Sequence, residues 1–222
     1  MSGFRPLYPL VLVDTALFSV DDEGLKVLLV RRAEEPAVRK WALPGGMVKP
    51  HEDTSLVAAA RRILRDKVSV ELPHLEEVCT ASGPDRDPRG WSISVLFFAL
   101  LPRDQVQAVV KSKVEAVEWT NPANPGHRIA FDHETLLHRA VEVLRDRVER
   151  SVLPLQLMPE RFTLTQLQRT CEVVLGRPLD KSVFRRRLKG SAALIELDEF
   201  ERGVQRPAQL FRAAEGFSFS QR

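Results

Sequence analysis

The sequence predicts an α/β fold, an α+β sandwich, followed by a second, smaller winged helix-turn-helix domain. Two observations predict it. β-prone runs alternate with two segments of helical period in the first two thirds of the chain, and two amphipathic helices precede two short β-prone runs in the last third. With 222 residues, the chain is long enough for two domains that each bury a core. We expect these domains at residues 1–150 and 161–222, joined by a linker at residues 151–160.

The composition is typical of a soluble globular protein. Hydrophobic residues make up 44% of the chain and charged residues 28%, and no segment approaches the uninterrupted apolar length of a membrane span. The apolar run at residues 10–20 is interrupted by Asp14 and lacks a basic leader, which favours a strand over a signal peptide. Cys79 and Cys171 lack metal-ligand spacing, so we expect free thiols. These observations predict a cytoplasmic protein without a membrane partner.

The first expected elements are two strands that form a hairpin. Residues 10–20 and 25–31 are β-prone, and residues 21–24 between them offer a glycine for the turn. Arg31 and Arg32 follow at the end of the second strand. These arginines either face a ligand and pair with phosphate, or form a solvated strand end.

The stretch at residues 41–50, WALPGGMVKP, is followed by a segment of helical period at residues 55–67. Gly45 and Gly46 lack a Cβ, so the backbone there can come close to a diphosphate. Trp41 either stacks on a base or covers the core. The whole stretch resembles a Nudix box.

This resemblance implies a metal site that the sequence has lost. In Nudix hydrolases, glutamates of the box helix hold magnesium against the pyrophosphate, because a hard cation requires several carboxylate oxygens. Ile63 and Lys67 occupy two of the three acidic positions, and only Asp66 keeps the third. We therefore expect no catalytic residue, no metal ligand and no hydrolase activity. The alternative is a displaced metal site built from Glu52, Asp53 and Asp66.

A charged loop and a helix complete the first domain. Further strands are expected at residues 78–82, 93–101 and 114–119. In the loop at residues 83–90, two prolines and two glycines restrict the backbone, while Arg86 and Arg89 offer guanidinium groups suited to phosphates. This loop is either an exposed turn or a ligand-facing loop. The helical period at residues 134–150 predicts the helix that closes the domain.

The second domain is expected to begin after Pro154 and Pro159, because both residues resist helix propagation. Thr163 and Gln166 have the spacing of a capping box, which predicts the start of a helix. Gly176 is expected to end that helix.

The next helix carries an unusual number of cations. Asp180 can cap it, and Phe184 and Leu188 share one face because they are four residues apart. The other face then carries Lys181, Ser182, Arg185, Arg186 and Lys189. Two β-prone runs, at residues 194–197 and 208–212, complete the outline of a winged helix-turn-helix. A basic helix is often only a solvated face, but its pairing with a hairpin and a cap favours DNA binding.

Both domains together resemble the NrtR family of Nudix-related transcriptional regulators, in which an inactive Nudix domain precedes a winged helix. The resemblance rests on six ordered motifs, at residues 40–46, 84–90, 131–133, 162–168, 176–186 and 206–211. It implies a homodimer that binds double-stranded operator DNA and represses genes of NAD or related metabolism. It also implies release from DNA when ADP-ribose or a similar nucleotide effector binds, with no cofactor required.

The expected site residues combine this resemblance with the patterns described above. The expected ligand-binding residues are Arg31, Arg32, Trp41, Gly45, Gly46, Asp87, Arg89, Phe131 and His133. The expected DNA-binding residues are Thr163, Thr165, Lys181, Ser182, Arg185, Arg186, Lys189, Arg206 and Gln209. One departure from the family is the acidic wing at residues 196–201, which phosphate would repel. The wing therefore either faces away from DNA or meets a different operator.

Two other functions stay open from the sequence alone. One is a Nudix pyrophosphatase with the displaced metal site, and the other is a nucleotide-binding adaptor that meets another protein through residues 160–212. Ile63 and Lys67 argue against the enzyme. The row formed by Lys181, Arg185 and Lys189 argues against the adaptor.

Overall fold

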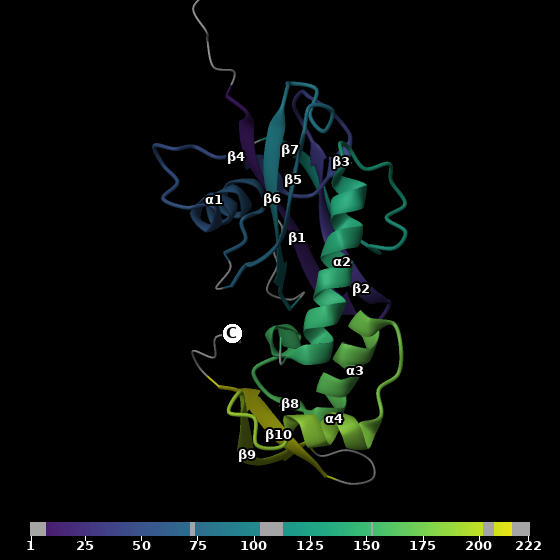
Figure 1. Cartoon of the computed structure of the whole chain (residues 1–222). Helices are drawn as coiled ribbons and strands as arrows, with labels where there is room; N and C mark the ends of the chain where they lie inside the picture. The colour runs from purple at the N-terminus through teal and green to yellow at the C-terminus, as the bar shows by residue number, and fades with distance from the viewer. Residues whose placement is uncertain (1–7, 72–73, 103–112, 152, 202–206, 215–222) are drawn as a thin grey trace, which may run out of the picture. The chain divides into compact units, whose positions relative to one another are not determined.

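The structure is a computed structural model that describes residues 8–71, 74–102, 113–151, 153–201 and 207–214 (Figure 1). The chain folds into two compact units; the second takes residues from 142 onward, together with residues 19–25 and the end of β6 (Ser92–Leu100), so that the helix α2 (His133–Arg150) spans the limit at residues 141 and 142. The sequence instead predicts a domain limit at residue 150. The exact domain limits stay a prediction.

The first unit contains a seven-stranded sheet, which confirms the expected fold class. The strands are β1 (Leu10–Asp21), β2 (Gly24–Arg32), β3 (Trp41–Ala42), β4 (Gly45–Met47), β5 (Glu76–Gly83), β6 (Ser92–Leu100) and β7 (Val114–Thr120). The order is β3-β2-β1-β6-β5, with β4 paired to β1 and β7 paired to β2. The pairings of β4 with β1 and of β7 with β2 are antiparallel.

The core of this unit lies on both faces of the sheet. Residues 12–19 of β1 are buried without interruption, where a strand with one solvated face would alternate buried and exposed positions. In Figure 1, α1 (Leu56–Val68) lies on the left of the sheet and α2 on the right. Leu136, Leu137 and Ala140 of α2 are buried, as the helical period predicts.

Local sequence signals set the ends and the packing of α1. The Ser55 side chain accepts a hydrogen bond from the backbone N–H of Ala58 (3.0 Å) and so caps the helix at its start. Ser69 ends the helix with a φ of 57°, a left-handed conformation that glycine would adopt at lower cost. At Gly46, an added Cβ would lie 3.2 Å from the Ile63 side chain. The glycine therefore lets β4 approach α1 closely.

The segment expected to be a linker is packed rather than open. Residues 153–157 form the 3-10 helix η2 (Leu153–Leu157), in which Leu153, Pro154 and Leu155 are buried. This helix contacts α3 (Leu164–Leu175) of the second unit. Proline fits here because the first turn of a helix needs no N–H donor from it.

The second unit has the helix, helix and hairpin that the sequence predicts. Its elements are β8 (Phe162–Thr163), α3, α4 (Lys181–Leu188), β9 (Leu194–Glu201) and β10 (Ala208–Ala213). The strands form an antiparallel sheet in the order β8-β10-β9, and β8 is a strand that the sequence patterns do not predict. The side chains of Phe162, Leu167, Val174 and Phe184 form its core.

The predicted chemistry of the two cysteines is confirmed, since Cys79 and Cys171 are free thiols. Burial raises the pKa of Cys171 to about 12, so this thiol stays protonated at neutral pH. Within the described ranges, no helix is both long and apolar enough to cross a membrane. The cytoplasmic location stays a prediction.

Thr163 has a structural role at the start of α3. Its hydroxyl accepts a hydrogen bond from the backbone N–H of Gln166 (3.2 Å), and the Gln166 side chain accepts one from the backbone N–H of Thr163 (2.7 Å). These two bonds form a complete capping box. The Thr163 side chain is also buried, so its hydroxyl serves the cap, and a DNA contact at Thr163 stays a prediction.

We expect Thr163→Ala to reduce the free energy of unfolding by about 0.5–2 kcal/mol, because the first turn of α3 loses its cap. The measurement is urea unfolding followed by circular dichroism. Thr165→Ala removes the same atoms from an exposed position on the same helix and is the matched control. Equal stability of the two variants would contradict the capping role.

Candidate functional site

A cavity of about 800 Å³ opens in the first unit beside the glycine pair. Seven of the nine residues predicted to bind a ligand line it: Arg32, Gly45, Gly46, Asp87, Arg89, Phe131 and His133. Lys67 and Ile63 of the degenerate box helix line the same cavity. The fold thus brings the glycine pair, the charged loop and the start of α2 together, while ligand contact by these residues stays a prediction.

Arg31 and Trp41 do not line the cavity, so the structure does not bring them together with the other seven residues, and ligand contact by them stays a prediction. Arg32 lines the cavity and Arg31 does not, at a point where the pairing of β2 with β7 shifts register. Arg31 instead pairs with Glu115 (Nε to Oε2, 3.3 Å). The Trp41 ring stacks on the ring of His127, with centroids 4.6 Å apart.

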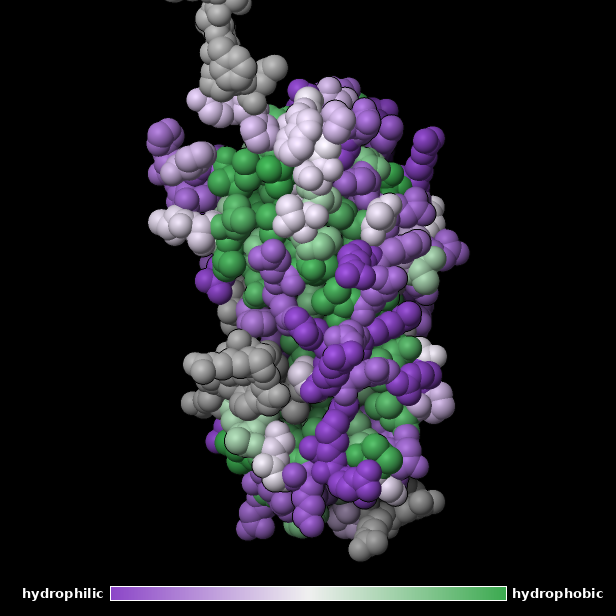
Figure 2. Space-filling model, viewed as in Figure 1, coloured by the Kyte–Doolittle hydropathy of each residue, from purple (hydrophilic) through white to green (hydrophobic). Residues whose placement is uncertain are grey.

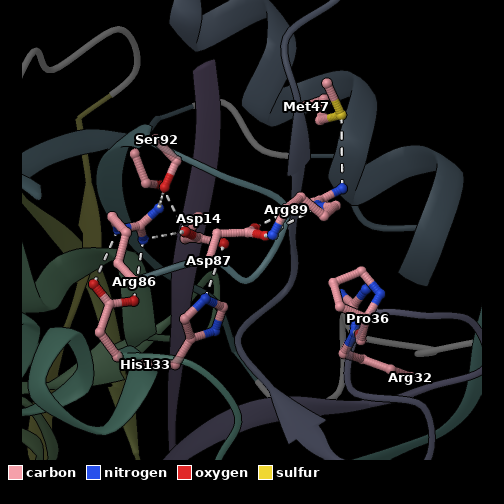
Figure 3. Close-up of polar contacts among 12 residues, drawn as sticks. Asp14, Arg32, Pro36, Met47, Arg86, Asp87, Arg89, Ser92 and His133 are labelled. Atoms are coloured by element: carbon pink, nitrogen blue, oxygen red, sulfur yellow. Dashed lines mark hydrogen bonds and ion pairs between the residues drawn. The ribbon is translucent and has the colours of Figure 1, made fainter. Parts of the chain in front are cut away.

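Asp14 lies at the centre of the buried polar contacts beside this cavity, and the sequence patterns predict no role for it (Figure 3). Its Oδ2 accepts a hydrogen bond from the Ser94 hydroxyl (2.6 Å) and lies 3.8 Å from Nη2 of Arg86. An added Cβ on Gly45 would lie 1.8 Å from Asp14 Oδ1, a distance at which the two atoms overlap. The carboxylate therefore requires glycine at position 45, independently of any ligand.

His133 connects this carboxylate to the segment between β3 and β4, just before the glycine pair. Its Nδ1 accepts a hydrogen bond from the backbone N–H of Leu43 (3.1 Å). In a neutral imidazole the proton then resides on Nε2, which lies 3.5 Å from Oδ1 of Asp14. The start of α2 is therefore fixed against β1 by a polar contact.

The arginines of the charged loop at residues 83–90 are held by ion pairs, one within the loop and one to Asp132. Arg86 donates two hydrogen bonds to Asp132, both 3.1 Å long, and its side chain is only 7% exposed. Arg89 donates from Nε and Nη2 to Asp87, and these bonds lower the pKa of the Asp87 carboxyl. Asp87 itself is buried, whereas most of the loop is exposed, and the choice between an exposed turn and a ligand-facing loop stays open.

Two cations in the cavity have no acidic partner. Arg32 donates from Nε to the Pro36 carbonyl (2.7 Å) and lies over the Phe131 ring at 5.2 Å, and Lys67 Nζ donates to the Gly45 carbonyl. No carboxylate oxygen of the described residues lies within 4.0 Å of either group, and we call the two residues the cation pair. Burial lowers both pKa values; that of Lys67 falls to about 8, with further lowering by the charge of Arg32.

The remaining acids of the box lie close to cations of the protein itself. Asp53 accepts hydrogen bonds from Nε and Nη2 of Arg62 (both 2.7 Å), which hold the pKa of Asp53 at about 2. Glu52 pairs with Lys49 at 3.0 Å, and Asp66 is half exposed. Within the described part of the chain, no group of three or more potential metal ligands comes together. The donor set present does not fit a divalent cation.

On the second unit, α4 presents the exposed polar face that the sequence predicts. Lys181, Ser182, Arg185, Arg186 and Lys189 are exposed, whereas Phe184 and Leu188 are buried. Val183 lies among these residues with 53% of its surface exposed, and the helical period could have identified it. Arg187 differs from its neighbours because it donates to the Glu149 carbonyl of α2. Figure 2 shows hydrophilic side chains over much of the visible surface of α2 and α4.

The expected DNA contacts outside α4 have different outcomes. Thr165 is exposed on α3, and Arg206 lies outside the described residues. The Gln209 amide donates to the carbonyls of Leu197 and Glu199, so it joins the two strands of the wing and is not a free donor. The acidic residues of β9 are all exposed, and Glu199 among them pairs with Arg161 (2.6 Å).

Comparisons with known families match both parts of the chain. The model of the family described as NUDIX domain matches residues 12–140, and the model described as NrtR DNA-binding winged helix domain matches residues 154–213. A ligand-sized cavity in a Nudix domain, joined to a DNA-binding winged helix, defines a ligand-responsive regulator of transcription.

Individual relatives extend over nearly the whole chain. The ADPR responsive transcriptional repressor NtrR of Acinetobacter baylyi is 42% identical over 93% of this chain and 82% of its own length. The crystal structure of Shewanella oneidensis NrtR with a 27mer DNA is 36% identical, with a TM-score of 0.82 over 92% of this chain and 93% of that one. The chain belongs to the NrtR family of Nudix-related transcriptional regulators.

A third relative is an enzyme. The ADP-ribose pyrophosphatase of Methanocaldococcus jannaschii is 31% identical over 59% of this chain and 72% of its own length. This similarity concerns the Nudix side of the molecule, where the identity of the residues at the metal positions decides whether hydrolysis can occur.

We expect Lys67→Met to stabilise the ligand-free protein, because it removes a half-buried ammonium without an acidic partner. The melting temperature at pH 7 should rise by about 2 to 4 °C, the shift typical of 1 kcal/mol in a chain of this size. The folded-state pKa of Lys67, about 8, lies below the unfolded value of 10.5, so wild type gains stability as pH rises between these values. The advantage of the variant should therefore shrink over this window. Arg65→Met, at an exposed site on the same helix, is the control and should show no such gain.

Proposed function

We propose that this chain is a repressor that binds operator DNA through α4 and releases it when ADP-ribose or a related nucleotide enters the cavity. The observation that carries the proposal is the cation pair, because two partly buried cations without acidic partners favour an anionic ligand. A nucleotide diphosphate supplies that charge, and a cavity of about 800 Å³ is large enough to hold it.

The relatives support both halves of this proposal. The S. oneidensis NrtR that matches this chain was solved with DNA, and its NUDIX domain was solved with ADP ribose. That second structure is 38% identical, with a TM-score of 0.58 over 62% of this chain and 89% of that one. The A. baylyi relative is an ADPR responsive repressor. Genes of NAD or related metabolism are accordingly the proposed targets.

The proposed regulator does not hydrolyse its ligand and needs no cofactor. Ile63 offers no oxygen to a metal, and Asp53 is held by Arg62. Without a bound metal ion, the pyrophosphate lacks the charge stabilisation on which Nudix hydrolysis depends. The pyrophosphatase alternative requires these contacts to be broken.

The proposed assembly is a cytoplasmic homodimer on a palindromic site. One small winged helix offers few base contacts, whereas a two-fold dimer places two recognition helices in successive major grooves. The proposed domains are residues 1–150 for the ligand and residues 161–222 for DNA, with residues 151–160 joining them.

We expect Arg185→Ala to weaken operator binding by about 1 to 3 kcal/mol if this side chain contacts a base, and the double variant with Arg186→Ala to lose more. The measurement is a gel-shift titration of the DNA upstream of the protein's own gene. The control variant, Arg61→Ala with Arg65→Ala, removes the same charge from exposed positions on α1. If the α4 double variant binds the operator as tightly as wild type, α4 is not the recognition helix.

We expect ADP-ribose to bind the protein–operator complex about 5- to 150-fold more weakly than the free protein, the range typical of allosteric coupling. Linkage requires the operator affinity to fall by the same factor when ADP-ribose is present. Calorimetric titrations of both forms measure this ratio, and chromatography after incubation with magnesium should recover ADP-ribose intact. Identical affinities would show that the cavity does not control DNA binding, and release of AMP would support the pyrophosphatase alternative.

A further inference from the structure

The position of Lys67 in the cavity has a consequence beyond the loss of hydrolysis. Its Nζ donates to the carbonyl of Gly45, the first residue of the glycine pair. An ammonium group has three N–H donors, and the described residues accept only this one bond from it. Two N–H donors of Lys67 therefore remain for a ligand. They lie beside the glycine pair, where no side chain covers the backbone.

The neighbouring charges leave this region positive. Arg32 and Lys113 face Lys67 as like charges, and Asp14 and Glu34 face it as opposite charges. Lys113 and Glu34 pair with each other at 3.0 Å, and Asp14 accepts a hydrogen bond from the Ser94 hydroxyl. The cation pair is thus the part of this group that has no direct acidic partner.

The acids that could attract a metal ion are directed to other groups. Asp53 is occupied by Arg62, and Asp66 lies 3.9 Å from Nη1 of the same arginine. A cation placed by the protein itself can supply the attraction for phosphate oxygens that a bound metal would otherwise supply. Lysine is suited to this task because its ammonium is a compact charge that also donates hydrogen bonds.

We propose that Lys67, together with Arg32, binds the diphosphate of the ligand in place of a divalent metal ion, so that ligand binding by this protein requires no metal. This inference rests on the proposed function, since it assumes that the cavity holds a nucleotide diphosphate. Lys67 stands where Nudix hydrolases have an acidic metal ligand. The inference gives this lysine a binding role of its own, beyond the loss of that ligand. Two adjacent cations also favour a diphosphate over a monophosphate, because the second phosphate supplies the second partner.

The test is calorimetry of ADP-ribose binding in EDTA and in magnesium chloride. Wild type should bind with the same affinity in both solutions. Lys67→Met should bind about 10- to 100-fold more weakly, the effect typical of losing a hydrogen bond to a charged group. Lys67→Arg retains a cation and should recover part of the affinity. Arg65→Met carries the same change of charge on the same helix, outside the cavity, and should bind like wild type.

The possible failures are distinguishable. If EDTA abolishes binding by wild type and magnesium restores it, the cavity uses a metal ion, and this inference is overturned while the proposed function stands. If Lys67→Met is folded by its melting curve and binds like wild type, the role of Lys67 is likewise overturned. If wild type binds ADP-ribose in neither solution, the proposed nucleotide ligand fails, and this inference fails with it.

Discussion

The buried carboxylate of Asp14 is the constraint on which the first unit depends. A charged group in a core is tolerated only when polar partners surround it, and these partners come from separate parts of the chain: Ser94 on β6, Arg86 on the charged loop and His133 at the start of α2. The same carboxylate excludes a side chain at Gly45. The Asp14 carboxylate therefore fixes the wall of the cavity at Gly45, and the backbone there is arranged before any ligand binds.

The cation pair illustrates how a binding site can be less stable than the protein around it. Burial lowers the pKa values of Arg32 and Lys67, with further lowering by Arg89 at Arg32 and by Arg32 at Lys67, so both charges are less favourable here than in water. A site of this kind gains affinity from relieving that cost when the ligand binds. The two cations thus destabilise the free protein and would be stabilised by a bound anion. Functional sites commonly lower the stability of the free protein in this way.

The sequence was sufficient for the elements whose signals are local. The glycine pair, the capping box at Thr163 and the basic face of α4 all depend on spacing within one element. It was insufficient where tertiary contacts decide. Asp14 is a single acid within an apolar run, and no neighbouring residue in the sequence predicts which side chains it contacts. Which of Arg31 and Arg32 lines the cavity depends on how β2 packs in the fold. Two adjacent arginines give no sequence signal that distinguishes them.

The burial of η2 bears on how winged helices of this kind can be exchanged between proteins during evolution. Leu153 and Leu155 lie upstream of the first winged-helix strand, yet their side chains are buried and η2 contacts α3. A gene fusion that joined a new sensor at residue 160 would leave these apolar groups behind and remove part of the packing around α3. The transferable module therefore begins before Leu153, and successful recombination points should lie within or upstream of α2.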